Sequence, residues 1–344
     1  MYSIKYKKLI FFFAIFAMAA FGNSAEVAKY AGEFISTGVG ARALGMGGAY
    51  VARGGDVTYG FWNPAGLSQI NYPEIAAMHS ERFAGVVNYD YLAFALPFRK
   101  NESLALSVIR LGIDDIPISA IPRADLGTDD TYTDENGNIK VNRPYVDRYV
   151  SDAEYAFYLS YAKNLGATFS YGVNAKFLRK GVGENTAWGI GFDFGVLWRP
   201  WRQLMIGANF QDVTTTLLAW DTGRKELISP TLKTGVAYPF DIPFLKSRLL
   251  IAGDVDTRFE GREEAAQFNA GAASFDLRLG CELLFRDVIA LRLGRDDLGN
   301  MTAGAGIVLP RLDVDYAFAQ HSVLKNTHRI SLRVRLEEER FMRK

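Results

Sequence analysis

Apolar and polar residues alternate along most of the chain after residue 72. In the clearest example one face holds Phe275, Leu277, Leu279, Cys281, Leu283 and Phe285. The opposite face holds Ser274, Asp276, Arg278, Gly280, Glu282 and, as the one exception, Leu284. Successive side chains of a β-strand point to opposite sides. The pattern therefore predicts strands that have one apolar face and one polar, ionic face.

The same alternation recurs along the remaining sequence and predicts about fourteen strands. We expect them at 74–82, 88–98, 102–111, 151–163, 167–179, 187–198, 202–212, 230–239, 246–258, 274–285, 288–294, 300–308, 311–319 and 327–336.

Three further features separate a membrane barrel from a soluble β-sandwich, which also alternates. Most of the expected strands are longer than the usual five or six residues of soluble sheets. Aromatic residues are frequent on the apolar face and near strand ends. Short connections (99–101, 164–166, 199–201, 286–287) alternate with long ones (112–150, 213–229, 259–273). These features predict an all-β fold, a transmembrane antiparallel β-barrel with both ends on the periplasmic side.

The cost of exposing charge to lipid decides which face is which. An Arg or Lys that faces lipid at mid-membrane costs about 2–4 kcal/mol, and a reversed register would expose several. The ionic face therefore lines the lumen. The expected luminal charges are Lys176, Asp193, Asp254, Asp256, Asp276, Arg278, Glu282, Arg292, Asp313, Asp315, Arg333 and Arg335.

Both ends of the chain differ from this pattern. Residues 1–25 carry Lys5, Lys7 and Lys8 before an apolar run that is too short to span a bilayer, which needs about 20 residues. We interpret 1–25 as a signal peptide; a membrane-tethered N-terminus is the alternative. Residues 26–71 are rich in glycine and do not alternate, which favours a plug inside the lumen over a periplasmic linker. The barrel then occupies 72–336, and 337–344 form a charged periplasmic tail.

Composition excludes several classes of function. After removal of the signal's three lysines, 36 basic and 38 acidic residues remain, so no polybasic surface for nucleic acid is expected. The single cysteine, Cys281, excludes an internal disulfide. Three scattered histidines, His79, His321 and His328, do not indicate a metal site. Hydrophobic residues make up 49% of the chain, yet mean hydropathy is −0.01, in keeping with interleaved rather than blocked apolar residues.

One segment of the predicted plug resembles a known family. The run from Gly38 to Tyr50, continued by Asp56 and by Trp62 to Leu67, is similar to the N-terminal region of the PorV/PorQ family, a branch of the FadL-like outer-membrane proteins. The resemblance implies a fourteen-stranded barrel whose N-terminal segment folds into the lumen. The motif residues are Gly38, Gly40, Ala41, Arg42, Gly45, Gly47, Gly48, Asp56, Trp62, Asn63, Pro64 and Gly66.

Arg42 is a lone cation in this small and apolar run, suited to pairing with luminal carboxylates. A solvated surface charge is the alternative interpretation. One feature departs from the family pattern, because the last strand is followed by a charged tail from Glu337 to Lys344 rather than ending on an aromatic residue. The tail puts the usual insertion motif of such barrels in doubt.

No enzyme chemistry is indicated. The acidic run Asp134 to Ile139 partly mimics a calcium loop, but positions one and twelve of an EF-hand would fall on Tyr132 and Arg143. The glycine pairs at 189–191 and 304–306 are interpreted as small luminal positions, since no Walker lysine follows them. We expect no catalytic residues, no metal and no cofactor.

Two classes of function remain, both in the outer membrane of a two-membrane bacterium. Similarity to PorV implies a non-enzymatic part in protein secretion or surface attachment through the type IX system, with a translocon or exported proteins as partners. FadL-like architecture implies instead a passive transporter of hydrophobic small molecules. The sequence leans to the first, because the motif is closer to PorV/PorQ and the longest loop is polar and acidic. In both cases outer-membrane lipid surrounds the barrel.

Overall fold

The computed structural model describes residues 26–27, 32–82, 85–259, 266–320 and 326–343. The expected signal peptide and His321 lie outside the described residues.

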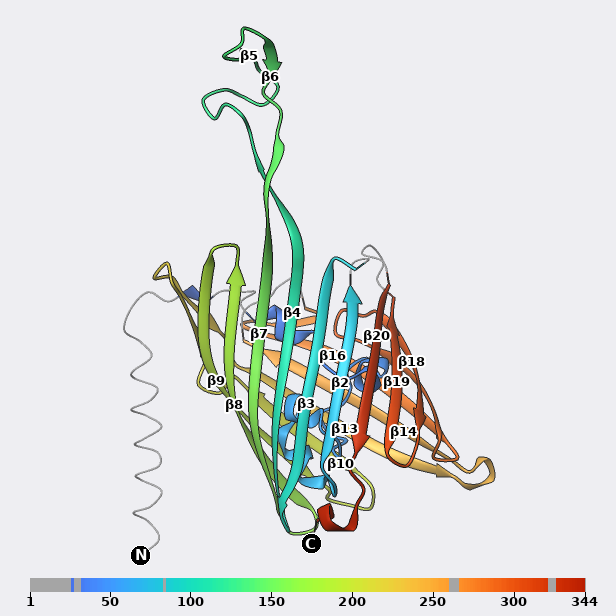
Figure 1. Ribbon diagram of the computed structural model, residues 1–344. Coiled ribbons are helices and arrows are strands. Elements are labelled where there is room, and N and C mark those ends of the chain that lie inside the picture. Colours follow the sequence, from blue (N-terminus) through green and yellow to red (C-terminus); the bar gives the residue numbers. More distant parts are fainter. Residues whose placement is uncertain (1–25, 28–31, 83–84, 260–265, 321–325, 344) are drawn as a thin grey trace, which may run out of the picture.

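Fourteen antiparallel strands form a closed barrel in which each strand pairs with its neighbour along the chain and the last strand pairs with the first (Figure 1). The wall strands are β2 (Glu74–Arg82), β3 (Val87–Arg99), β4 (Glu102–Ala120), β7 (Tyr145–Leu165), β8 (Phe169–Val182), β9 (Asn185–Trp198), β10 (Met205–Gln211), β13 (Thr231–Ile242), β14 (Ser247–Arg258), β16 (Ala273–Phe285), β17 (Ile289–Arg295), β18 (Met301–Val308), β19 (Leu312–Ala319) and β20 (Thr327–Arg335). The predicted fold class is confirmed.

The wall is apolar outside and polar inside, as the alternation predicts. On β9, Trp188, Ile190, Phe192 and Phe194 are exposed, while the residues between them are buried. Trp188 and Trp198 lie ten residues apart near opposite ends of this strand. Ten residues at about 3.3 Å each, tilted by about 40°, span about 25 Å, the height of the apolar band of such barrels. The two tryptophans therefore lie at the two interfaces of the membrane.

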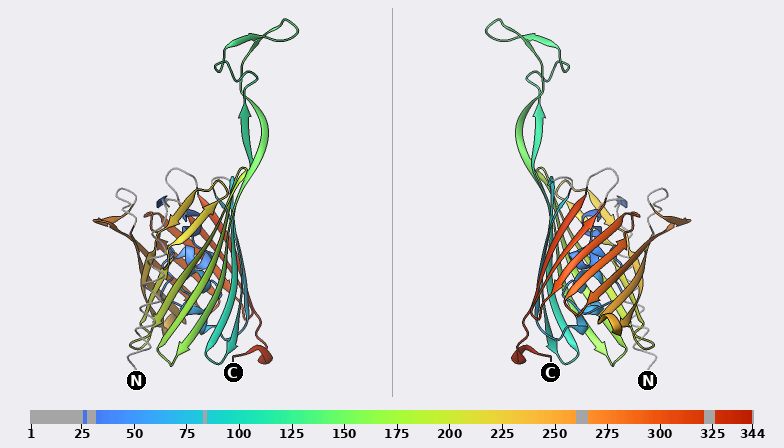
Figure 2. Two further views of the ribbon diagram at one scale, coloured as in Figure 1. Left: turned by 90° about the vertical axis from the view of Figure 1, so that its left-hand side faces the viewer. Right: turned by 90° about the vertical axis from the view of Figure 1, so that its right-hand side faces the viewer.

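The connection 112–150 is more ordered than predicted. β4 and β7 continue past the barrel as a two-stranded ribbon (Figures 1 and 2), and its tip contains a small hairpin of β5 (Thr131–Thr133) and β6 (Ile139–Val141). Interpreting the whole stretch as a loop was wrong, because Ile116 and Val150 pair across the ribbon. A bulge at Asp115, with φ of 57°, shifts the register and interrupts the alternation.

Two other connections predicted as loops also contain strands. After β10 the chain leaves the ladder in a turn at Asp212 and Thr215, which have φ of 53° and 58°. β11 (Thr216–Trp220) continues along β9 and forms a hairpin with β12 (Lys225–Ile228), whereas β10 pairs with β13. β12 also pairs with β1 (Glu26–Val27) in parallel, and β15 (Phe268–Ala270) pairs with β16.

Residues 32–71, called the plug below, lie inside the barrel (Figure 1). They form α2 (Glu33–Ser36), α3 (Ala41–Gly45), α4 (Tyr59–Trp62) and the 3₁₀ helix η2 (Pro64–Gln69). None of the helices in the described part of the chain is long and apolar enough to cross a membrane. Tyr50 stacks on Tyr59, and Phe61 packs edge-on against Trp62. The buried apolar core therefore lies between the plug and the wall.

Short 3₁₀ helices lie at the end of the barrel where the turns are short. The 3₁₀ helix η3 (Pro243–Leu245) connects β13 to β14, and η5 (Glu339–Phe341) follows β20. Beyond η5, Arg343 donates from its backbone to the carbonyl of Asn71 at 2.9 Å and from its side chain to the hydroxyl of Ser103 at 2.5 Å. The charged tail thus folds back onto the barrel rim. In barrels of this kind the short turns face the periplasm.

Candidate functional site

Side chains of the wall satisfy the backbone of the plug. The carboxylate of Asp254 accepts the backbone N–H groups of Tyr50 and Val51 at 2.6 and 2.8 Å. The Ser331 hydroxyl accepts the N–H of Ala41 at 2.7 Å. Asn174, Asn209 and Thr302 donate to the carbonyls of Gly60, Trp62 and Gly45. Buried backbone groups need such partners, so these contacts fix the position of the plug.

Glycines of the wall let the plug backbone approach closely. A Cβ at Gly294 would lie 2.2 Å from the carbonyl carbon of Met46, and one at Gly280 would lie 2.3 Å from the carbonyl oxygen of the same residue. Gly172 and Gly207 have the same relation to Pro64 and Val51. The glycine pairs at 189–191 and 304–306 also face inward, and Gly304 contacts Gly45 of α3. The wall is therefore shaped to this plug.

The plug motif forms the internal scaffold of the plug. The Trp62 indole donates to the carbonyl of Val39 at 2.9 Å, and the Asn63 amide donates to the carbonyls of Val51 and Val196, both at 3.0 Å. Asp56 accepts from the Tyr50 hydroxyl at 2.6 Å.

The small motif residues lie in the same tight packing. Position 47 requires glycine for two reasons: its φ is +67°, and a Cβ there would lie 2.4 Å from the Arg295 carbonyl oxygen. The other small residues of the motif, all buried within the barrel, are Gly38, Gly40, Ala41, Gly45, Gly48, Pro64 and Gly66.

Arg42 joins the plug to the wall through an ionic cluster. Its Nε and Nη2 donate to the two oxygens of Glu282 at 2.8 and 2.5 Å. Glu282 also accepts from Arg292 at 2.7 Å, and Arg292 in turn lies 2.7 Å from Asp315. Arg42 is therefore mostly buried and paired rather than solvated.

The other expected luminal charges also face inward and form three more clusters. Lys176 lies 2.8 Å from Asp193 and 2.7 Å from Asp212. Asp256 lies 3.3 Å from Arg278 and 3.7 Å from Lys233. The third cluster, at the periplasmic end, contains Asp313, Arg333, Arg335 and Glu74.

Two of the predicted residues are neighbours of the Asp256–Arg278 pair across β14 and β16 and make other contacts. Asp254 binds the plug backbone, and Asp276 accepts from the N–H of Gln267 at 3.1 Å. The wall residues Glu74, Asn174, Asn209, Asp212, Lys233 and Ser331 were missed as site residues. Their inward positions in the alternation could have identified them.

Two larger cavities flank the plug, and no residue lines both. The outer cavity, about 400 Å³, lies at the long-loop end among α2, Leu44, Gly47, Arg82, Leu111 and Arg329. The periplasmic cavity, about 370 Å³, lies among Arg42, Arg53, Gln69, Met205, Leu250, Glu282 and Leu284. Leu284, the exception in the alternation, thus faces the lumen. The plug and the Arg42–Glu282 pair separate the two cavities.

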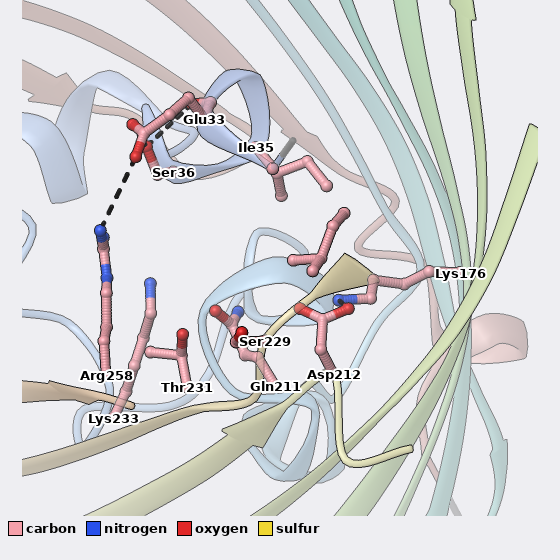
Figure 3. A pocket seen from close by; sticks show the side chains of 12 residues that line it. Glu33, Ile35, Ser36, Lys176, Gln211, Asp212, Ser229, Thr231, Lys233 and Arg258 are labelled. Atoms are coloured by element: carbon pink, nitrogen blue, oxygen red, sulfur yellow. Dashed lines mark hydrogen bonds and ion pairs between the residues drawn. The ribbon is translucent and has the colours of Figure 1, made fainter. Parts of the chain in front are cut away.

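A smaller cavity, about 60 Å³, lies beneath α2, where Lys233 and Arg258 point toward the helix from the wall and Lys176 pairs with Asp212 (Figure 3). Among the described residues, no group of three or more His, Cys, Asp or Glu is arranged to hold a metal ion.

The closed fourteen-stranded barrel matches the FadL type of outer-membrane barrel. The toluene transporter TbuX of Ralstonia pickettii superposes with a TM-score of 0.54 at 13% identity, over 87% of this chain and 98% of its own. The monoaromatic hydrocarbon channel CymD gives 0.55 at 12% identity, over 88% and 98%. A FadL homologue of Pseudomonas aeruginosa gives 0.55 at 10% identity, over 87% and 98%. No protein-family model and no curated protein matches the sequence.

These similarities establish the fold and are too distant in sequence to establish more. The fold supports a place in the outer membrane. Of the similar structures named above, TbuX is a transporter and CymD is a channel. They do not support the narrower resemblance to PorV/PorQ or the expected role in type IX secretion, which was the preferred interpretation of the sequence.

Proposed function

We propose that this protein is a passive transporter of hydrophobic small molecules across the outer membrane. The observation that carries the proposal is the plugged barrel, with one cavity open toward each end and the plug between them. The shared fold with hydrocarbon transporters supports the hydrophobic class of solute. The expected signal peptide at residues 1–25 and the short turns at one end of the barrel fit export into the outer membrane.

Passage through this lumen requires the plug to move. Its core residues Tyr50, Tyr59 and Trp62 are fully buried, and no residue lines both cavities. Besides the apolar core that it shares with the wall, the plug is joined to the wall through hydrogen bonds and ion pairs, which can be exchanged one at a time. Its helices are each six residues or shorter. A segment built this way can shift without unfolding the barrel.

The proposal is tested by uptake of radiolabelled toluene into cells that lack their own transporter. Cells that express the protein should take up toluene faster than cells with an empty vector. A plug lock gives the matched control: Ala41→Cys with Ser331→Cys, in a Cys281→Ala background. The Ala41 nitrogen lies 2.7 Å from the Ser331 hydroxyl, so the two thiols will be close.

Oxidation should reduce uptake by the double variant to the empty-vector level, and reductant should restore it. Toluene uptake by each single-cysteine variant should be the same after oxidation and after reduction. Uptake that never exceeds the empty-vector level would overturn the transport proposal. Uptake that persists in the oxidised double variant would show that solute passes without displacement of the plug.

A part in protein secretion now rests on the motif resemblance alone. Purification of the tagged protein from native outer membranes addresses it directly. A large translocon barrel or exported proteins among the copurifying partners would restore that function, whereas lipid without protein partners agrees with transport.

A further inference from the structure

A row of mostly polar side chains crosses the outward face of the barrel near the long-loop end. Its members lie directly opposite one another on β2, β3, β4, β7, β8, β9, β11 and β12: His79, Asp90, Arg110, Tyr155, Arg179, Trp188, Ala219 and Lys225. Arg179 and Trp188 each lie three residues from the outer end of their strand. This upper row therefore lies at the outer interface of the membrane, at the level of Trp188.

A second row, two residues deeper on each of these strands, is entirely apolar. This lower row, also in direct register, contains Ala77, Leu92, Val108, Phe157, Phe177, Ile190, Leu217 and Leu227. Phe157, Phe177 and Ile190 are 46%, 47% and 54% exposed on the outside of the barrel, where acyl chains contact them. The two rows thus mark the boundary between the headgroups and the hydrocarbon of the outer leaflet.

Two cations of the upper row are not neutralised by the protein. Arg110 lies 3.4 Å from Asp90, but no carboxylate in the described part of the chain forms an ion pair with Arg179 or with Lys225. β8 and β12, which carry these two residues, are three strand spacings apart, or about 14 Å at about 4.8 Å each. Two cations at this separation match a ligand that carries more than one anionic group.

Aromatic rings hold the Arg179 side chain at the interface. Its guanidinium carbon lies 6.0 Å from the centre of the Tyr155 ring and 5.6 Å from that of the Trp188 ring. Stacking of this kind orients the plane of a guanidinium and leaves N–H donors at its edge for an anion. Arg179 is therefore positioned to donate toward the headgroups.

We propose that Arg179 and Lys225, with Trp188 between them, bind the headgroup of an outer-leaflet lipid that carries two phosphate groups. Phosphate oxygens accept strong, charge-assisted hydrogen bonds from both cations. The acyl chains of the same lipid lie against Phe157, Phe177 and the other side chains of the lower row. A lipid has this order of groups, anionic at the interface and apolar immediately below it. The site lies on the opposite face of the wall from the lumen and does not depend on the transport function.

Native mass spectrometry of the full chain in detergent tests the proposal. The probes are diphosphoryl lipid A, monophosphoryl lipid A and phosphatidylcholine. We expect diphosphoryl lipid A to bind about fivefold more tightly than monophosphoryl lipid A, and phosphatidylcholine to bind most weakly. One cation near an anionic membrane surface contributes a factor of about five. Arg179→Gln and Lys225→Gln should therefore each weaken diphosphoryl lipid A binding by about fivefold, and the double variant by about 25-fold.

Two further variants separate a specific site from general charge attraction. Arg179→Lys keeps the charge and should weaken binding less than Arg179→Gln. Arg295→Gln is the matched control, because Arg295 also faces outward at the outer end of β17 but lies between Leu279 and Met301. We expect it to change binding by less than about twofold.

Several results would overturn the lipid site. These are equal binding of the two forms of lipid A, undiminished binding by the double variant, no binding at all, or equal losses in Arg179→Gln and Arg295→Gln. A membrane protein that copurifies with the wild type but not with the double variant, at unchanged lipid A binding, would also overturn it and assign the upper row to a protein interface.

Discussion

Replacing Arg42 by Ala removes the ionic contact that joins the plug to the wall between the two cavities. The guanidinium makes two hydrogen bonds to Glu282, and that carboxylate keeps its other partner, Arg292, in the variant. We therefore expect the plug to be displaced more often, while the barrel wall itself remains folded.

The magnitude follows from these contacts. A hydrogen bond to a charged group contributes about 1.5–3 kcal/mol, and loss of one partner of a buried ion pair costs about 3–5 kcal/mol. Because Arg292 still compensates Glu282, the loss should lie at the lower end, about 3 kcal/mol. At about 1.4 kcal/mol for each factor of ten, the ratio of displaced to seated plug should rise by about 100-fold.

Single-channel recording in planar bilayers measures this ratio as open probability. The matched control is Arg53→Ala, in the same segment, because the Arg53 side chain is 23% exposed and lies 3.7 Å from its nearest carboxylate, Asp56. That variant should change open probability by less than about tenfold. Equal effects of the two variants, or an unchanged Arg42→Ala channel, would refute the assignment of Arg42 as the contact that seats the plug.

Three other predictions concern close packing, the outer tip and the lipid face. Gly294→Ala should displace the plug at a cost of about 1–3 kcal/mol, because the added methyl would overlap the Met46 backbone. Protease cleavage within residues 32–71 should then be faster than in the wild type. Gly181→Ala is the control, because its methyl has room, and its cleavage rate should match the wild type. The backbone N–H of Asn138 and then Lys140 lower the pKa of Asp134 to about 2. The stabilisation of the tip by this carboxylate is therefore complete at neutral pH and is lost as pH falls from about 4 through about 2. Asp134→Ala should therefore reduce amide-exchange protection of residues 131–141 much more at pH 7 than at pH 2; an equal loss at both would contradict this. Leu291→Arg, on the outward face of β17, should lower the free energy of unfolding by about 2–4 kcal/mol in urea titrations in lipid vesicles, and a wild-type value would argue against lipid contact there.

The strands could be predicted from the sequence because lipid enforces their alternation. A shift of one residue in β16 would turn Arg278 and Glu282 outward, so the period of two is strict there. The ribbon lies above the membrane, where no such constraint acts. Pro117 and the bulge at Asp115 then interrupt the pattern, and the continuation of β4 was missed.

The partners of the plug could not be predicted in the same way. Glycine content indicated an interior segment, but Arg42 meets Glu282 across 240 residues of sequence, and no periodicity encodes that contact. The short motif suggested a secretion protein, whereas the whole fold resembles hydrocarbon transporters.

The account depends most on a plug that divides the lumen of a membrane barrel into two separate cavities. Labelling of single cysteines in intact cells, in a Cys281→Ala background, tests this directly. The reagent is a maleimide on a polymer chain too large for porins. Ser36→Cys, in the outer cavity, should be labelled in intact cells, and Gln69→Cys, in the periplasmic cavity, only after the outer membrane is permeabilised. Labelling of both cysteines in intact cells would contradict the division of the lumen.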